Sequence, residues 1–145
     1  MSPLLADHPL LGPLVGLNAW TFAIEGLLYK RRIPALSKYG VTFDPATVKK
    51  QKAEKLPAFV QWPADNFNNL LEQPTQFYAV LLALSVLNVR DKATVRFAWG
   101  YVGLRIIHSI IHVSTNNPGI RFPVWLTSSF VVAGLTAKAA YELFF

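Results

Sequence analysis

The amino-acid sequence predicts an all-α integral membrane protein, a four-helix bundle with up-down topology formed by a single domain over residues 1–145. Two observations support this prediction. Of the 145 residues, 52% are hydrophobic and only 15% are charged, whereas about a quarter of the residues of a soluble domain are charged. Four apolar stretches also reach the ~20 residues that a helix needs to cross a bilayer. These stretches are residues 10–29, 67–89, 93–113 and 122–145.

The first apolar stretch is expected to remain in the mature protein as a membrane helix. It is longer than the apolar region of a typical signal peptide, and it lacks a basic start and an A-x-A cleavage site. Basic residues are concentrated in the segment that follows, namely Lys30, Arg31, Arg32, Lys38, Lys49, Lys50, Lys52 and Lys55. By the positive-inside rule this segment faces the cytoplasm, so both termini are predicted to be non-cytoplasmic. The bacterial inner membrane and the endoplasmic reticulum both remain open as locations.

Short turns separate the other three stretches. Pro74 lies inside the second stretch, and a proline there removes a backbone hydrogen bond and is expected to bend the helix. Asn88, Arg90 and Asp91 mark a tight turn, so the second and third helices are predicted to be antiparallel neighbours. The Ser-Thr-Asn-Asn-Pro-Gly segment 114–119 is predicted to be a turn as well.

Polar residues interrupt the apolar helices at regular spacing. The second stretch and its approach carry Asp65, Asn69, Glu72 and Gln76, which follow the i, i+4, i+7, i+11 pattern of one helical face. The third stretch carries Arg105, His108 and His112, and the fourth begins at Arg121. Such residues usually face a bundle interior or a polar cavity. Because neighbouring helices run in opposite directions, the sequence predicts one polar site in the cytoplasmic half of the bundle.

Other interpretations of these residues remain open at this point. Glu72 and Arg105 could form a buried ion pair that only fixes helix register. Two histidines on one helix are more often hydrogen-bonded structure or ligand contacts than metal ligands, and no metal is expected. Arg121 could extend to the membrane interface. The net charge of +6 is concentrated in one segment, so no nucleic-acid partner is expected. The chain has no cysteine, so thiol chemistry would need a thiol from the substrate.

These motifs together resemble the MAPEG family, the membrane-associated proteins in eicosanoid and glutathione metabolism. The resemblance extends over nearly the whole chain. It rests on four spans, a basic first loop, the Asn-x-x-Glu of Asn69 and Glu72, the Arg-x-x-His of Arg105 and His108, and Arg121 after a short loop.

The resemblance implies a homotrimer that binds glutathione between neighbouring subunits, close to the cytoplasm. By this comparison Asn69, Glu72, Arg105 and His108 resemble glutathione-binding residues. His112 takes a position often held by tyrosine, and Arg121 matches the arginine thought to stabilise the glutathione thiolate.

The implied activity is that of a glutathione-dependent transferase or peroxidase acting on lipophilic electrophiles or hydroperoxides, with membrane lipids around it. Eukaryotic catalytic members carry arginines just before the Asn-x-x-Glu, where this chain has Asp65 and Asn68. One turn after Arg121, where the resemblance implies an aromatic residue with a hydroxyl, this chain has Trp125. The missing upstream arginines favour the alternative, a non-catalytic membrane protein of the same fold that binds lipid or partner helices.

Overall fold

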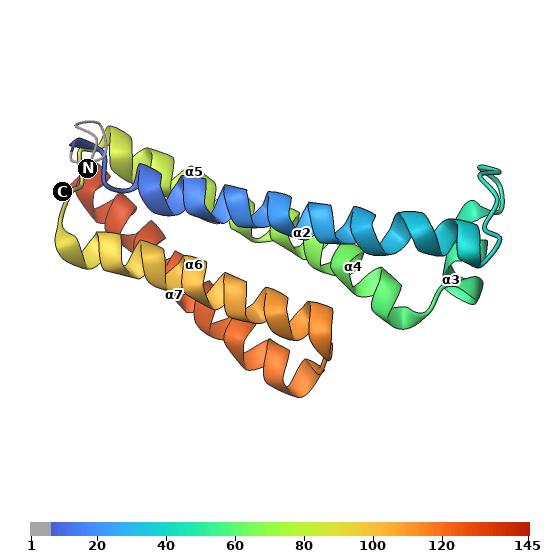
Figure 1. Cartoon of the computed structure of the whole chain (residues 1–145). Coiled ribbons are helices and arrows are strands. Elements are labelled where there is room, and N and C mark those ends of the chain that lie inside the picture. Colours follow the sequence, from blue (N-terminus) through green and yellow to red (C-terminus); the bar gives the residue numbers. More distant parts are fainter. Residues whose placement is uncertain (1–6) are drawn as a thin grey trace.

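The computed structural model describes residues 7–145, so residues 1–6 of the predicted domain lie outside the described range. Within that range the chain is helical and forms no strand (Figure 1). The helices are α2 (Leu11–Lys38), α3 (Val48–Lys55), α4 (Ala58–Glu72), α5 (Pro74–Val86), α6 (Lys92–Ser114) and α7 (Pro118–Phe144). The rods α2, α4 with α5, α6 and α7 run in alternating directions (Figure 1). The start of α2 and the end of α7 therefore lie at the same end of the molecule.

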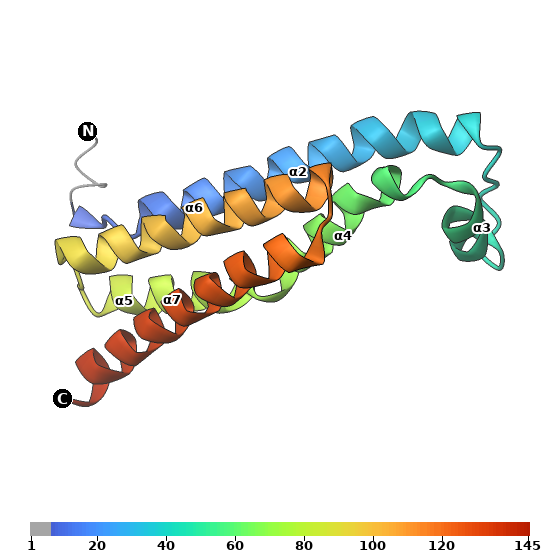
Figure 2. The same ribbon diagram turned by 90° about the horizontal axis from the view of Figure 1, so that it is seen from below.

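The predicted second span is two helices rather than one. Gln73 is both the C-cap of α4 and the N-cap of α5, and Pro74 is the first residue of α5. The backbone of Gln73 keeps helical angles (φ −60°, ψ −39°), so α5 continues the course of α4 (Figure 2). The missing N–H of Pro74 interrupts the hydrogen-bond ladder at this point. The predicted bend is thus a break between two helices.

Within residues 7–145, two helices, α2 and α7, are long and apolar enough to cross a membrane. The predicted stretches 67–89 and 93–113 do not meet the same criterion, and each has a physical reason. The break at Gln73 shortens the helices of the second stretch, while α6 carries arginines and histidines that lower its mean hydropathy. The chain is a helical protein with membrane-like helices, and its full set of spans stays a prediction.

The main hydrophobic core lies where α2, α5, α6 and α7 meet. Its buried members include Leu17 and Ile24 of α2, Phe77, Leu81 and Leu84 of α5, Tyr101 of α6, and Val132 and Leu135 of α7. The Phe77 and Tyr101 rings stack with centroids 4.2 Å apart. This core fixes α6 between the other helices. It thereby determines the positions of the polar side chains in the second half of α6.

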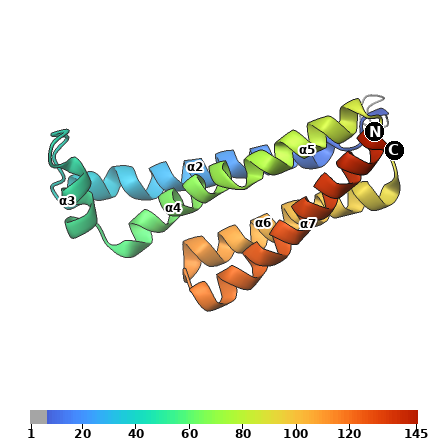
Figure 3. The ribbon, with the colours of Figure 1, turned by 180° about the vertical axis from the view of Figure 1, so that it is seen from behind.

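A smaller apolar cluster holds the basic end of the molecule together. It consists of Ala35, Leu36, Val41, Leu56 and Val60, from the end of α2, the segments flanking α3, and the start of α4. At this end α2, α3 and α4 extend beyond α6 and α7 (Figures 1 and 3). The lysine-rich segment is therefore a small folded projection, with α3 packed across its tip.

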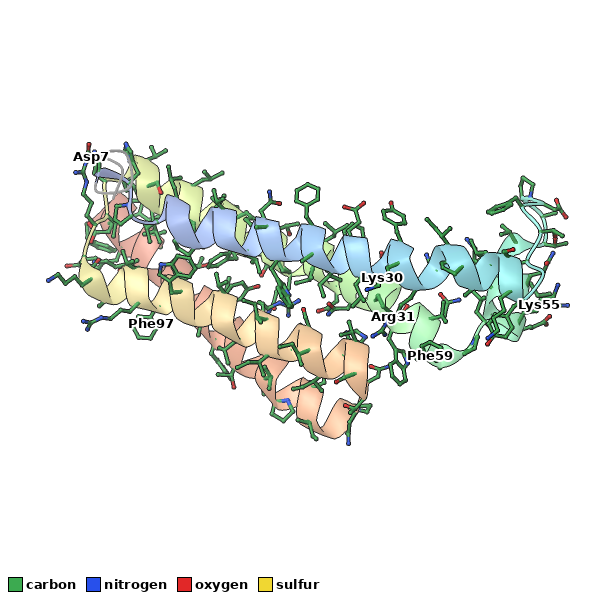
Figure 4. All side chains as sticks on the ribbon, in the orientation of Figure 1. Asp7, Lys30, Arg31, Lys55, Phe59 and Phe97 are labelled. Atoms are coloured by element: carbon green, nitrogen blue, oxygen red, sulfur yellow. The ribbon has the colours of Figure 1, made fainter. Side chains whose placement is uncertain are left out.

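Arg31 joins the projection to the rest of the bundle. Its Nη1 donates hydrogen bonds to the backbone oxygen of Phe59 at 3.1 Å and to that of Val113 at 2.9 Å (Figure 4). The neighbouring Arg32 donates from Nη2 to Gln61 Oε1 at 2.7 Å. Both arginines therefore join α2 to α4, and Arg31 also joins it to the end of α6.

Candidate functional site

A pocket of about 350 Å³ lies between α4, α6 and the start of α7. Its lining residues are Asn69, His108, His112, Pro118, Arg121, Phe122 and Trp125. Four of the six residues predicted from the sequence thus share one cavity. The pocket has a basic and polar wall and an aromatic wall, which is formed by Phe122 and Trp125, whose rings stack with centroids 6.1 Å apart.

The two histidines stand one turn apart on the inner face of α6. His108 and His112 are both buried, and their rings meet edge to face with centroids 5.6 Å apart. His112 Nδ1 lies 3.3 Å from Nδ2 of Asn66 on α4. That hydrogen bond fixes the orientation of the His112 ring, because the partner Asn66 is itself fully buried.

Arg105 lies outside the pocket, one turn deeper in the bundle than His108. Its side chain is fully buried. Nη2 donates to Asn69 Oδ1 at 2.6 Å and to the Asn69 backbone oxygen at 3.1 Å, and Nη1 donates to Gln73 Oε1 at 3.4 Å. Arg105 therefore holds the carbonyl end of the Asn69 amide. The Nδ2 end of Asn69 is left as the group that can donate to a ligand.

Glu72 does not join this pocket within the single chain. Its side chain is exposed, and among the described residues it forms no salt bridge with Arg105. The buried ion pair considered from the sequence is therefore not formed. Glu72 is one residue from the break at Gln73 and lies on the outer surface of α4.

Arg121 enters the pocket from the first turn of α7. That helix is capped by Asn117, whose Oδ1 accepts a hydrogen bond from the Gly119 N–H at 2.9 Å. Nη1 of the partly buried Arg121 donates to Oδ1 of Asn116, the residue before the cap. The guanidinium is thus held on one side by the turn, and it lines the cavity together with the two histidines.

Several polar residues of this region escaped the prediction from sequence. Gln73 donates from Nε2 to Ser129 Oγ, and its Oε1 accepts from Ser128 Oγ at 3.4 Å as well as from Arg105. Asn66 and Asn116 were also not predicted. Gln73 falls next to the regular Asn69–Glu72 spacing, so periodicity did not mark it; its position before Pro74 is the signal that could have.

The donor set offers little to a metal ion. Among residues 7–145 no group of three His, Cys, Asp or Glu side chains is placed to hold one. The pocket instead presents a guanidinium, two imidazoles and an amide beside an apolar wall. Such an arrangement suits an anionic or polar organic ligand that also carries or meets an apolar group.

The fold and the pocket define a class of helical protein with membrane-like helices and a polar cavity between α4, α6 and the start of α7. The family can be named more closely, because the model of the MAPEG family matches residues 10–141 of the 145-residue chain. The chain therefore belongs to the MAPEG family. No curated protein and no solved structure gives a match.

Proposed function

We propose that this protein is a membrane-bound, glutathione-dependent transferase or peroxidase acting on lipophilic electrophiles or hydroperoxides. The observation that carries the proposal is the position of Arg121, which shares one pocket with His108, His112 and Asn69. A free thiol has a pKa near 8.5, and a neighbouring cation lowers it. The permanently charged guanidinium would therefore raise the thiolate fraction at neutral pH.

The remaining pocket residues have roles that follow from their contacts. Asn69, oriented by Arg105, would donate from Nδ2 to a carbonyl or carboxylate of the tripeptide. His108 and His112 would bind further polar groups along the same wall. The aromatic wall of Phe122 and Trp125 would receive the lipophilic partner, which reaches the protein from the bilayer.

Glu72 favours a site shared between subunits. Because its carboxylate is exposed on the outer surface of α4, it would contact glutathione only in the pocket of a neighbouring copy. A carboxylate suits the amino group of the tripeptide. This supports the homotrimer that family membership suggests, with the ligand bound between subunits and close to the cytoplasmic side.

Thermal unfolding of the purified protein in mild detergent, with and without glutathione, tests binding. S-methylglutathione is the matched ligand, because it keeps the peptide and lacks the free thiol. We expect both to raise the melting temperature. Two assays then test catalysis. Transferase activity is measured as conjugation of glutathione to 1-chloro-2,4-dinitrobenzene. Peroxidase activity is measured as reduction of cumene hydroperoxide to the alcohol and water, with two glutathione molecules oxidised to the disulfide. A folded protein with no stabilisation and no turnover would overturn the proposal.

One observation favours a second function, lipid binding without catalysis. Phe122 and Trp125 give the pocket an aromatic wall, and by the family resemblance Trp125 stands where catalytic members are expected to carry an aromatic hydroxyl. Under this alternative, anionic phospholipid added to the detergent would raise the melting temperature, while glutathione would not. Stabilisation by glutathione with turnover decides for the transferase or peroxidase.

A further inference from the structure

The turn between α6 and α7 has an unusual backbone at Asn116. This residue has a φ of 51°, in the left-handed region that residues other than glycine, asparagine and aspartate rarely adopt. Its N–H donates to the Ile111 oxygen at 2.8 Å, which closes the end of α6. In this conformation the side chain turns toward α7, and Oδ1 accepts the hydrogen bond from Arg121 Nη1.

From this geometry we infer that Asn116 is a positioning residue that holds the Arg121 guanidinium against the wall of the pocket. The inference rests on the proposed function, since it concerns the arginine assigned to the thiolate. A hydrogen bond to a charged donor is stronger than one between neutral groups. It uses one edge of the guanidinium and leaves the other N–H groups free toward the cavity. Without it, a long arginine side chain at a helix end would be free to extend toward the membrane interface.

The sequence position of Asn116 supports this role. Asn117 caps α7, Pro118 lines the pocket, and Arg121 follows within the same turn of helix. The left-handed residue thus sets both the direction of α7 and the position of the acceptor oxygen. His112, one turn before Asn116, lines the same cavity, so the turn connects the histidines of α6 with Arg121 of α7.

The turn between α5 and α6, at the opposite end of α6, provides a matched comparison. Asn88 also has a left-handed backbone, with a φ of 57°. Its Oδ1 likewise accepts a hydrogen bond from an arginine, Arg90 Nη2, at 3.1 Å. Asn88 follows α5 and contributes nothing to the pocket. Glycine adopts this backbone without strain, so Asn116→Gly and Asn88→Gly remove equivalent amides at equal backbone cost.

The first measurement needs no glutathione. Phenylglyoxal modifies free guanidinium groups, and peptide mass spectrometry gives the rate at Arg121 in each variant. We expect Asn116→Gly to raise this rate several-fold, whereas Asn88→Gly leaves it as in the wild type. Asn116→Asp keeps an acceptor oxygen and tolerates the same backbone, so its rate should stay low. Equal rates at Arg121 in Asn116→Gly and the wild type would overturn the inference.

The second measurement follows glutathione conjugation against pH. We expect Asn116→Gly to lower kcat/KM about tenfold at neutral pH, the scale of a lost charge-assisted hydrogen bond, and to move the rate profile toward the pKa of the free thiol. Asn88→Gly should match the wild type in both. An active wild type whose profile is unchanged in Asn116→Gly would overturn the inference. An inactive wild type with faster labelling in Asn116→Gly would instead reject the proposed function and support the Asn116–Arg121 contact.

Discussion

Two arginines of the polar region have the same chemistry and different surroundings. Arg105 is fully buried, and both of its terminal nitrogens donate to α4 or to the break that follows it. Arg121 is only partly buried, is held by the turn before it, and lines the cavity. Burial and partner geometry therefore make Arg105 part of the framework of the bundle, and they support the proposed role of Arg121 in binding a ligand.

Replacing Arg121 tests its assigned role directly. We expect Arg121→Ala to lower glutathione turnover at neutral pH far more than it lowers the melting temperature, because the bound thiol would then ionise nearer its free pKa. The rate profile should move to higher pH. Arg121→Lys should recover only part of the activity, since an ammonium lacks the planar donor fork. Full activity in Arg121→Lys together with Arg121→Ala would indicate an interfacial residue.

The sequence predicted the pocket residues on α6 and α7 because one helical face and one short turn determine their positions. Spacing was sufficient to place His108, His112 and Arg121 near one another. It was not sufficient on α4, where Asn69 and Glu72 belong to one predicted stripe and yet only Asn69 reaches the pocket. Arg105 holds the side chain of Asn69 in place, and no local pattern describes this long-range contact. Arg105 itself is fully buried and does not line the pocket, and its predicted part in glutathione binding stays a prediction.

At the scale of the helices, polar contacts at both ends of α6 hold this helix in position. Its start is capped by Asp91, and the oxygen of Val113 near its end is bound by Arg31 from α2. The histidines stand between these two anchors. Turn residues in the sequence marked the ends of α5 and α6, but α7 begins at Pro118, inside the segment predicted to be a turn. The long-range bond of Arg31 depends on tertiary packing and had no local signal.

Removing Arg31 should loosen the histidine end of α6. Arg31→Ala leaves the oxygens of Phe59 and Val113 without this donor, and hydrogen bonds to a charged group contribute about 1.5–3 kcal/mol. We expect a lower melting temperature in detergent and weaker stabilisation by glutathione. Lys30→Ala is the control, because Lys30 is adjacent to Arg31 and exposed, and its replacement also removes one positive charge. Equal melting temperatures for the two variants would contradict the anchoring role.

Asp91 should make the stability of α6 depend on pH. Its carboxylate accepts from the Thr94 N–H at 2.9 Å and from Thr94 Oγ1 at 2.7 Å. These hydrogen bonds hold the pKa of Asp91 below its ordinary value. The ionised cap therefore stabilises the helix above the unfolded pKa, near 3.9, and its contribution is lost as the pH falls through the lowered value.

The corresponding measurement is thermal unfolding of Asp91→Ala at neutral and acidic pH. Loss of an N-cap costs about 0.5–2 kcal/mol, so the variant should melt below the wild type at neutral pH. The difference should shrink when the wild-type carboxyl is protonated. Asp91→Asn keeps a capping oxygen without the charge, so it should melt between Asp91→Ala and the wild type at neutral pH. A difference for Asp91→Ala that is the same at both pH values would argue against the carboxylate.

For the whole molecule, the projection formed by the end of α2, α3 and the start of α4 determines the expected orientation. It carries the lysine-rich segment and extends beyond α6 and α7, at the end of the bundle where α6 ends and α7 begins (Figures 1 and 3). The positive-inside rule predicts that this side faces the cytoplasm. The chain contains no cysteine, so a single introduced cysteine reports its own position. With the reagent on the non-cytoplasmic side, we expect Lys50→Cys to react with an impermeant maleimide only after the membrane has been permeabilised. Labelling from the outer face alone would reverse the topology.

Assembly is the second expectation at this scale. The exposed carboxylate of Glu72 and the pocket beside it suggest that the site is completed by a neighbouring copy. Native mass spectrometry in mild detergent should therefore show a trimer. Glu72→Gln should keep the trimer and weaken glutathione binding. A monomer at all accessible concentrations would contradict the shared site.

The place of Arg121 on α7 has an energetic consequence for the empty protein. The start of a helix carries partial positive charge, so a cation in the first turn is unfavourable by about 0.3–1 kcal/mol. Arg121 adds its charge at this end of α7, with Asn117 as a neutral cap. The fold balances this positive charge only in part, through the nearby carboxyl of Asp65. A bound anion would balance the rest, so part of the binding free energy would come from a cost that the unoccupied protein already bears. Substitutions selected only for ligand-free stability should tend to remove Arg121, and a more stable protein obtained in that way should bind anions less well.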